Sequence, residues 1–378
     1  MTKPLDIVFI GLSLTSSWGN GHATTYRALL RGLARLGHRA LFLERDVSWY
    51  AENRDLPRPD FCNLALYSDR AALIRDYGER IAGADAVIVG SFVPEGIAVI
   101  DEVLARAQGV RAFYDIDTPV TLARLERGDC DYLARHQIPA LDAYLSFSGG
   151  EVLDVLADHF GAVAPHALYC AVDEDRYRPL DITKRWDLGY LGTYSDDRQP
   201  ALERLLLEPA RRLPHLRFVV AGPQYPAGIA WPANVERIEH VGPEDHAAFY
   251  AAQRHTLNVT RQDMIAAGWS PSVRLFEAAA CGVPIISDRW RGLDELLPED
   301  EAIVIADEAE RVVAVLAEEP PREARERAAR AREIILANHT GTNRAAQLLA
   351  LLSGRAARRA AASPERPKAS ATAFDPRR

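Results

Sequence analysis

The sequence has few cysteines, no surplus of positive charge and no long apolar run, and each of these absences argues against a class of protein. Its four cysteines in 378 residues are scattered, without a C-x-x-C pair or histidines at zinc-ligand spacing, so we expect neither a disulfide framework nor a zinc site. A formal net charge of −8 argues against nucleic acid as the main partner, because phosphate binding needs a basic surface. No apolar run is long enough to cross a membrane, and the N-terminus lacks a signal-peptide pattern. We therefore expect a soluble, cytoplasmic protein without a transmembrane segment.

Short runs rich in Val, Ile, Leu and Phe recur along the chain, and most are followed by a helical pattern. These runs cover residues 5–11, 39–44, 85–92, 110–115 and 142–148 in the first half, and 186–192, 216–222, 235–241, 255–260, 283–287 and 302–306 in the second. Buried strands that alternate with helices are typical of parallel sheets covered on both faces. The pattern predicts an α/β protein with two doubly wound Rossmann-like domains facing one another across a cleft.

A polar, proline-containing stretch at residues 171–184 interrupts this series and predicts a linker. We expect domains over 1–172 and 173–335, followed by a helix over 336–353 that packs back on the body. The remaining residues, 354–378, are mainly Ala, Arg, Pro and Ser without apolar periodicity, which predicts a disordered tail. The alternative for this tail is an electrostatic contact with a membrane surface.

Residues 268–287, GWSPSVRLFEAAACGVPIIS, have the pattern of a loop, a helix and a strand. Ser270 suits the N-cap, Pro271 the first helical position, and Gly282 the residue that ends a helix. The spacing therefore predicts a helix over 271–281, placed at the carboxyl-end side of the second sheet, where ligands of such sheets bind.

The start of this helix is a candidate phosphate site. The unpaired N–H groups of Ser272 and Val273, together with the helix dipole, favour an anion. At 1.5 Å per residue, Glu277 lies about 7.5 Å beyond Ser272 along the helix axis. This is roughly the distance from a pyrophosphate to the hydroxyls of its ribose. Arg274 shares that face and can neutralise a phosphate. The alternative is that Arg274 and Glu277 form an ordinary surface ion pair, and spacing alone leaves both interpretations open.

A glycine-rich loop follows the first predicted strand. The glycine spacing of this loop, together with Glu44 at the end of the next strand, approaches a dinucleotide-binding fingerprint. However, Thr24 stands where the third glycine of that fingerprint would be, and the loop glycines begin well after the end of the strand. These departures argue against a dehydrogenase. We expect the loop to reach into the cleft and to contact the acceptor or the donor phosphate, with His22 as a candidate catalytic residue. The loop residues are Gly19, Asn20, Gly21 and His22.

Asp115 and Asp117 form a D-x-D pattern at the end of another predicted strand. Such a pattern can hold a divalent cation, but it also occurs at residues 129–131 and 173–175, so we predict no metal site. We expect Asp115 to face the cleft and to orient an acceptor hydroxyl. The alternative is that the pattern serves helix capping, since Asp117 or Thr118 before Pro119 suits an N-cap.

The second half resembles the donor-binding domain of retaining glycosyltransferases with the GT-B architecture. LFEAAACGVPIIS (275–287) is similar to their donor-binding helix and strand, and LYCAVDEDRYRP (168–179) to the linker that opens the domain. LGYLGTYSDDRQPALERLL (188–206) resembles their phosphate loop and helix, and the next strands follow in order to about residue 305.

Segments outside that domain resemble one subfamily, the CgeB-like transferases. They are WGNGHATTYRALLRGLARLGH (18–38), FLERDVSWY (42–50), FYDIDTPVTL (113–122), YLSFSGG (144–150) and ILANHTGTNRA (335–345). The resemblance implies that the first domain lies on the acceptor side and that the second binds a nucleotide sugar.

The resemblance also implies a function and a set of donor-binding residues. These are Gly192, Thr193, Arg198, Ser272, Val273, Arg274 and Glu277. The implied function is transfer of a sugar, with retention, from a nucleoside diphosphate sugar to a hydroxyl acceptor without a resident cofactor. Arg198 would act with Asp115 and His22 in catalysis. The alternatives are a sugar-nucleotide 2-epimerase and a non-catalytic nucleotide-sugar-binding protein.

Two departures from the family pattern bear on the donor. Retaining members carry a Glu-x7-Glu pattern, and Trp269 stands where the first glutamate would be. In the phosphate loop, Thr193 replaces the usual arginine and Arg198 the usual lysine. Arg198 can still clamp a pyrophosphate, and Arg274 can replace the charge that is lost at Thr193.

Overall fold

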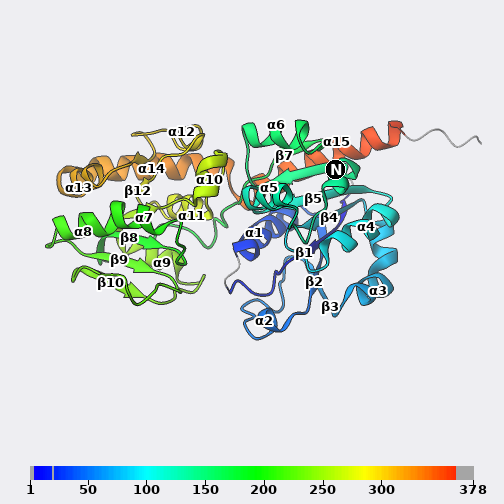
Figure 1. The fold of residues 1–378 in the computed structure, drawn as a ribbon, viewed down its shortest axis with the longest axis horizontal. Helices are drawn as coiled ribbons and strands as arrows, with labels where there is room; N and C mark the ends of the chain where they lie inside the picture. The colour runs from blue at the N-terminus through cyan, green and yellow to red at the C-terminus, as the bar shows by residue number, and fades with distance from the viewer. Residues whose placement is uncertain (1–3, 19–20, 363–378) are drawn as a thin grey trace, which may run out of the picture.

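The computed structural model describes residues 4–18 and 21–362, which form two lobes, each built on a parallel sheet (Figure 1). The first sheet has the order β3-β2-β1-β4-β5-β6-β7 and the second the order β10-β9-β8-β11-β12-β13. Every pair of neighbouring strands is parallel. The predicted fold class, two doubly wound α/β domains, is confirmed.

All the predicted strands are present, and two others were missed. The first sheet comprises β1 (Asp6–Gly11), β2 (Arg39–Arg45), β3 (Asn63–Tyr67), β4 (Ala86–Gly90), β5 (Val110–Asp115), β6 (Ala143–Ser146) and β7 (Pro165–Ala167). The second comprises β8 (Trp186–Leu191), β9 (Phe218–Ala221), β10 (Val235–Ile238), β11 (Gln253–Asn258), β12 (Ile285–Ser287) and β13 (Val304–Ile305). The missed strands, β3 and β7, are the two edges of the first sheet, where partial exposure weakens the apolar signal.

Helices connect the strands and cover the faces of the sheets. Those of the first half are α1 (Gly21–Arg35), α2 (Ser48–Ala51), α3 (Arg70–Gly83), α4 (Gly96–Arg106), α5 (Thr118–Arg127), the 3-10 helix η1 (Arg135–Ala140) and α6 (Glu151–Asp158). Those of the second half are α7 (Gln199–Leu202), the π-helical turn η2 (Glu203–Leu207), α8 (Glu208–Arg212), α9 (His246–Ala251), α10 (Gln262–Ala267), α11 (Val273–Ala280), α12 (Leu293–Leu296), α13 (Ala309–Glu318), α14 (Pro321–Asn338) and α15 (Gly341–Ala362).

Each sheet separates two apolar cores because successive side chains of a strand point to opposite faces. Along β1, Val8 and Ile10 pack in one core, while Ile7 and Phe9 pack in the other. β4 (AVIVG) is buried along its whole length, as expected for a central strand covered on both faces. This arrangement leaves the loops at the carboxyl ends of the strands as the places where polar chemistry can gather.

The last two helices tie the lobes together, and their bounds correct two predictions. We expected one helix over 336–353, but α14 ends at Asn338 and α15 runs from 341 to 362. Residues 354–362, assigned to a disordered tail, therefore continue α15, because its alanines and arginines are good helix formers. The rest of the predicted tail, 363–378, lies outside the described residues. Figure 1 shows α14 along the second lobe and α15 along the first.

α15 packs against α1 of the first domain at a close approach of two glycines. A Cβ at Gly32 would lie 2.1 Å from the carbonyl oxygen of Gly341, and a Cβ at Gly341 would lie 2.1 Å from that of Ala28. α15 therefore lies against the first domain through a contact that admits no side chain at either glycine.

Gly32→Ala is therefore expected to push α15 away from α1 and to lower the free energy of unfolding by roughly 1–3 kcal/mol, the usual cost of overpacking. Gly83→Ala in α3 is the matched control, because a Cβ added there would have no atom within 4 Å. Urea unfolding of both variants measures the difference. Equal stability of the two variants would contradict the close contact.

The described part of the chain contains no helix that is both long enough and apolar enough to cross a membrane.

Candidate donor site

The second sheet reverses its strand order between β8 and β11, which lie side by side. At such a switch point the loops that follow the two strands run in opposite directions and open a crevice for a ligand. The loop after β8 begins at Gly192, and the loop after β11 leads through Thr260 to Arg261. The sequence-predicted donor residues therefore lie at the place where this fold binds ligands.

The loop after β8 is held close to the sheet and to its own arginine. A Cβ at Gly222 would lie 2.1 Å from the carbonyl oxygen of Gly192, so the two backbones touch. Arg198 donates from Nη2 to the carbonyl oxygen of Thr193 at 2.5 Å and from Nε to Oγ of Ser195 at 3.0 Å. The predicted loop residues Gly192, Thr193 and Arg198 are thus brought together in one turn.

α11 begins two residues later than predicted. Its N-cap is Ser272, whereas we expected Ser270 as the cap and Pro271 as the first helical residue. Ser270 does not cap the helix because its hydroxyl is engaged elsewhere. The hydroxyl donates to the carbonyl oxygen of Gly268, and it lies 2.5 Å from the hydroxyl of Ser148. The predicted end is confirmed, since Gly282 follows the helix with φ of 67°.

The start of α11 has no side-chain cap. The hydroxyl of Ser272 donates to Oδ1 of Asn258 at 2.7 Å rather than accepting from the helix, so no side chain caps the first-turn amides that begin with Val273. Uncapped amides at the positive end of a helix dipole attract an anion. The predicted anion site at Ser272 and Val273 is therefore compatible with the structure.

Arg274 is buried and is held against the phosphate loop. It donates from Nε to the carbonyl oxygen of Leu191 at 2.6 Å and from Nη1 to Oδ1 of Asn258 at 2.7 Å. Its Nη2 faces Gly192, where a Cβ would lie 3.0 Å from it. The surface ion pair between Arg274 and Glu277, the alternative interpretation, is wrong: both side chains are buried, and Arg274 is held by other partners.

Three arginines lie near this crevice, and the carboxylate of Asp197 offsets part of the charge of Arg198 and Arg261. Burial lowers the pKa of Arg198, and the positive charges of Arg274 and Arg261 lower it further. Among the described residues, none of the three guanidinium groups forms an ion pair with a carboxylate within 4.0 Å. Mutual repulsion between neighbouring cations is costly unless an anion joins them. The arrangement therefore suits a diphosphate.

Glu277 is only 3% exposed and lies in a cluster of polar side chains beneath α11. Its Oε2 accepts a hydrogen bond from the hydroxyl of Tyr250 at 3.1 Å and lies 3.6 Å from Nδ1 of His246. Burial alone would raise the pKa of Glu277, but His246 and the hydroxyls of Tyr177 and Tyr250 outweigh it and hold the pKa below the ordinary value. Glu277 is therefore a buried, charged hydrogen-bond acceptor.

On the first domain, His22 and Asp117 lie together at the carboxyl ends of β1 and β5. Nε2 of His22 is 3.6 Å from Oδ2 of Asp117, whose side chain is 41% exposed. Of the predicted loop, Gly21 is the first residue of α1, while Gly19 and Asn20 lie outside the described residues.

Asp115 does not face the cleft, which corrects its predicted role. Along β5 it points to the same side as Phe113, into the core, and it is fully buried. Tyr144 donates to Oδ2 at 2.6 Å, and Thr121 donates to Oδ1 at 2.7 Å. Burial raises the pKa of Asp115 from 3.8 to about 6, although the two hydroxyl donors oppose the shift. Asp115 is therefore a structural group, and Asp117, with a side chain 41% exposed, is the carboxylate of the pair that is accessible.

Asp115→Asn is expected to change how folding depends on pH. The folded-state pKa lies above the unfolded value of 3.8, so this group stabilises the fold at low pH, and that stabilisation is lost as the pH rises towards about 6. The loss is roughly 2 kcal/mol between pH 4.5 and 7.5, at 1.36 kcal/mol per pKa unit. The free energy of unfolding, measured with urea, should therefore rise by that amount in the variant relative to the wild type on going from pH 4.5 to pH 7.5. Parallel pH profiles would contradict the assignment.

Glu44, which suggested a dinucleotide-binding ribose contact, has a different role. It is fully buried, and its carboxylate accepts from the backbone amides of Leu14 and Thr15 and from the hydroxyls of Ser13 and Thr15. Glu44 therefore shapes the loop after β1, and no oxygen is left facing a cofactor.

Within the described residues, no group of three or more His, Cys, Asp or Glu side chains is arranged to hold a metal ion. The four cysteines are all free.

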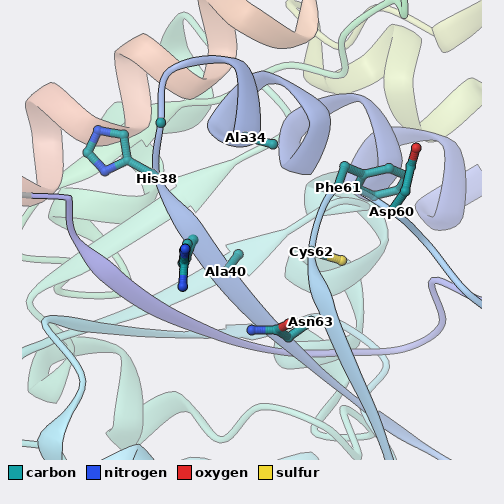
Figure 2. Close-up of a pocket in the computed structure, with 9 residues that line it drawn as sticks. Ala34, His38, Ala40, Asp60, Phe61, Cys62 and Asn63 are labelled. Carbon is teal, nitrogen blue, oxygen red and sulfur yellow. The ribbon is translucent and has the colours of Figure 1, made fainter.

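A cavity of about 350 Å³ lies away from this cleft, at the amino end of β2 (Figure 2). Figure 2 shows His38 on one side and Asp60, Phe61 and Cys62 on the other. Burial raises the pKa of Cys62 to about 12, so its thiol is not a nucleophile at neutral pH. This cavity has no convergent set of reactive groups, and we assign it no role in the chemistry.

Several residues that shape the crevice were not predicted from the sequence. Arg261 adds a third cation, Asn258 joins Ser272 to Arg274, and His246 supports Glu277. The position of Arg261, just after the predicted strand 255–260, was a usable signal, because ligands gather at strand carboxyl ends. The other two are visible only through contacts between segments distant in sequence.

Comparison with solved structures shows the GT-B fold over 93% of the chain. The sucrose-phosphate synthase of Thermosynechococcus elongatus is 13% identical with a TM-score of 0.65, covering 93% of this chain and 98% of that one. HepE from Anabaena in complex with UDP-glucose is 12% identical with a TM-score of 0.66, and the match covers 93% of this chain and 100% of HepE. An alpha-glucosyltransferase in complex with UDP-glucose and DNA is 13% identical with a TM-score of 0.69 and the same coverage.

The family comparison places a more specific similarity in the second half. Residues 198–350 match a family described as glycosyl transferase-like. The match begins at Arg198 of the phosphate loop and includes Arg261, Arg274 and Glu277. A sequence search found no match among curated proteins.

Proposed function

We propose that this protein transfers a sugar from a nucleoside diphosphate sugar to a hydroxyl acceptor. The observation that carries the proposal is the meeting of Arg198, Arg261 and Arg274 at the uncapped start of α11, at the switch point of the second sheet. A diphosphate is the anion that matches several cations beside a helix start. The match of residues 198–350 to a glycosyl transferase-like family supports the same conclusion.

The three arginines and the helix amides would stabilise the charge that develops as the donor breaks. The bond between the anomeric carbon and the diphosphate oxygen breaks, and the nucleoside diphosphate leaves with the electron pair. The acceptor oxygen bonds to the anomeric carbon, and its proton passes to an oxygen of the leaving phosphate. This route gives retention and needs no protein base, while His22 and Asp117 orient the acceptor hydroxyl. Preorganised charge of this kind is usually the largest contribution to rate.

Finer assignments follow as part of the proposal. The segments over 18–38, 42–50, 113–122, 144–150 and 335–345 favour the CgeB-like subfamily. Two structures similar in fold are named as complexes with UDP-glucose, which makes a UDP-hexose the first donor to test. Four free cysteines support a reducing compartment such as the cytoplasm.

The decisive experiment is an assay of nucleoside diphosphate release with UDP-, GDP-, dTDP- and ADP-sugars, with and without a panel of hydroxyl acceptors. Acceptor-dependent release of one diphosphate is expected, with the new glycosidic bond identified by mass spectrometry and its anomeric configuration by NMR. Conversion of the donor alone to an epimerised sugar would instead support a 2-epimerase. Saturable nucleotide-sugar binding without turnover would support a non-catalytic binding protein.

Transfer is expected to survive EDTA, because arginines and helix amides neutralise the diphosphate in place of a cation. The measurement is the initial rate after dialysis against EDTA, with a dialysed sample restored by Mn²⁺ or Mg²⁺ as the control. Loss of activity that either metal restores would contradict the proposed mode of phosphate binding.

A further inference from the structure

Trp269, which stands where related transferases carry a glutamate, lies at the joint between the two domains. Its φ of 42° is in the left-handed region, which is unfavourable for a bulky side chain and persists only where the surroundings impose it. The residue precedes α11 by a short loop, so whatever holds Trp269 also holds the start of the helix that carries the anion site. The backbone strain therefore occurs next to the helix start whose position sets the anion site.

The indole of Trp269 is wedged between one glycine of each domain. A Cβ at Gly150, the N-cap of α6 in the first domain, would lie 2.2 Å from the ring, and a Cβ at Gly292, the N-cap of α12 in the second, would lie 2.3 Å from it. Both glycines have positive φ, at 52° and 87°. Any side chain at either position would expel the ring, so the cradle admits only glycine.

Hydrogen bonds fix the same residue to both domains. The amide of Gly149 in the first domain donates to the carbonyl oxygen of Trp269 at 2.9 Å. The amide of Trp269 donates to the carbonyl oxygen of Arg291, in the second domain, at 2.6 Å. The indole Nε1 donates to Oε2 of Glu295 at 2.9 Å. All the hydrogen-bonding groups of Trp269 are therefore used, and they are divided between the lobes.

Neighbouring contacts extend this joint across the domain boundary. The hydroxyls of Ser148 and Ser270 lie 2.5 Å apart, and Arg291 forms an ion pair with Glu151 of α6. Behind the indole lies a cavity of about 200 Å³, lined in part by Tyr169 and Trp290. Without the indole, this space would extend into the joint and leave the two glycines without packing.

We propose that Trp269 is a positioning residue: an interdomain wedge that sets the start of α11, and so the donor diphosphate, at a fixed distance from the acceptor side. This proposal rests on the proposed function for its catalytic consequence, but not for its structural one. A misplacement of about 1 Å between reacting groups can cost roughly 10²-fold in rate. The wedge would therefore act on turnover while leaving the diphosphate contacts intact.

Two variants approach the joint from opposite sides. Trp269→Gly removes the ring and relieves the backbone strain, and Gly150→Ala expels the ring by a change in the first domain. Gly128→Ala is the matched control, since Gly128 also has positive φ, at 75°, but a Cβ added there would have no atom within 4 Å. Trp49→Ala, which removes a 61% exposed tryptophan, controls for loss of an indole.

Small-angle X-ray scattering of the ligand-free proteins should give a larger radius of gyration for Trp269→Gly and Gly150→Ala than for the wild type and both controls. In the transfer assay, kcat should fall by about 10²-fold with the Kd for nucleoside diphosphate within about twofold of the wild type. An unchanged radius of gyration would overturn the proposal, even if kcat fell, because the two domains would then keep their spacing without the wedge. If the wild type transfers no sugar, the proposed function fails, while scattering still decides whether Trp269 joins the domains.

Discussion

Arg274→Ala is expected to reduce kcat/KM by about 10²–10³-fold, the usual cost of removing one preorganised donor from a site of developing negative charge. Arg274 is 8% exposed, and its Nη2 faces the backbone of Gly192 in the phosphate loop. Affinity for a nucleoside diphosphate should fall with it, while affinity for the nucleoside should hardly change. Steady-state kinetics and calorimetric titration with both ligands measure these effects.

The same substitution should also lower stability, and the two effects must be separated. The carbonyl oxygen of Leu191 and Oδ1 of Asn258 lose a donor, which costs roughly 1–3 kcal/mol for buried groups. Arg274→Lys keeps the charge but not the planar fork, so its activity should be intermediate. Kinetics are compared at a temperature where unfolding curves show every variant to be folded.

Arg254 provides a matched control for Arg274. It lies near the other end of β11, away from the crevice, and its Nη1 donates to Asp187 at 2.9 Å. Its side chain is 38% exposed but that of Asp187 is only 12% exposed, so Arg254→Ala should cost roughly 1–3 kcal/mol of stability and leave kcat/KM unchanged. If Arg274→Ala binds diphosphate as tightly as this control does, the arginine cluster is not the donor site.

The fold was predictable because each buried strand is a continuous apolar run bounded by turn residues. The central strand β4 reads AVIVG and is buried throughout, which leaves little ambiguity. The edge strand β7 reads PHA, begins with proline and is only partly buried, so its sequence carries almost no strand signal. What decides the presence of β7 is pairing with β6, a contact between segments that the sequence does not mark.

The site was predictable to the level of segments and less so to the level of side-chain direction. Asp115 was placed in the cleft because it ends a strand, yet alternation along β5 already puts it on the side of Phe113. The late start of α11 could not have been anticipated, since Ser270 is diverted from capping by Ser148 of the other domain. Local capping rules give way where an interdomain contact uses the same hydroxyl.

Glu277→Ala is expected to lower the free energy of unfolding by roughly 3–5 kcal/mol, because it removes one member of a buried, charged, hydrogen-bonded group. The hydroxyl of Tyr250 loses its acceptor, and His246 loses the carboxylate that raises its pKa against the effect of burial. Glu277→Gln keeps the size and one acceptor oxygen, so it should lose less stability. The two variants together therefore separate folding from binding.

The pH dependence of stability should report this pair directly. The pKa of Glu277 is below its ordinary value of 4.5, so its contribution is present above that pH and is lost as the pH falls through the folded-state pKa. The pKa of His246 is above its ordinary value of 6.5, so its contribution is present below that pH and is lost as the pH rises through the folded-state pKa. Between these values the wild type should exceed Glu277→Gln in stability by the largest margin.

Binding decides whether Glu277 serves the donor as well as the fold. A charge-assisted hydrogen bond is worth roughly 1.5–3 kcal/mol, so Glu277→Gln should weaken UDP binding about tenfold or more and blunt the preference for UDP over 2′-deoxy-UDP. Tyr250→Phe, which removes one donor to the carboxylate but not the carboxylate itself, is the control and should keep that preference. Unchanged UDP affinity and unchanged discrimination in a folded Glu277→Gln protein would confine Glu277 to the core, because a carboxylate that contacts ribose cannot lose its charge without effect on the 2′-hydroxyl.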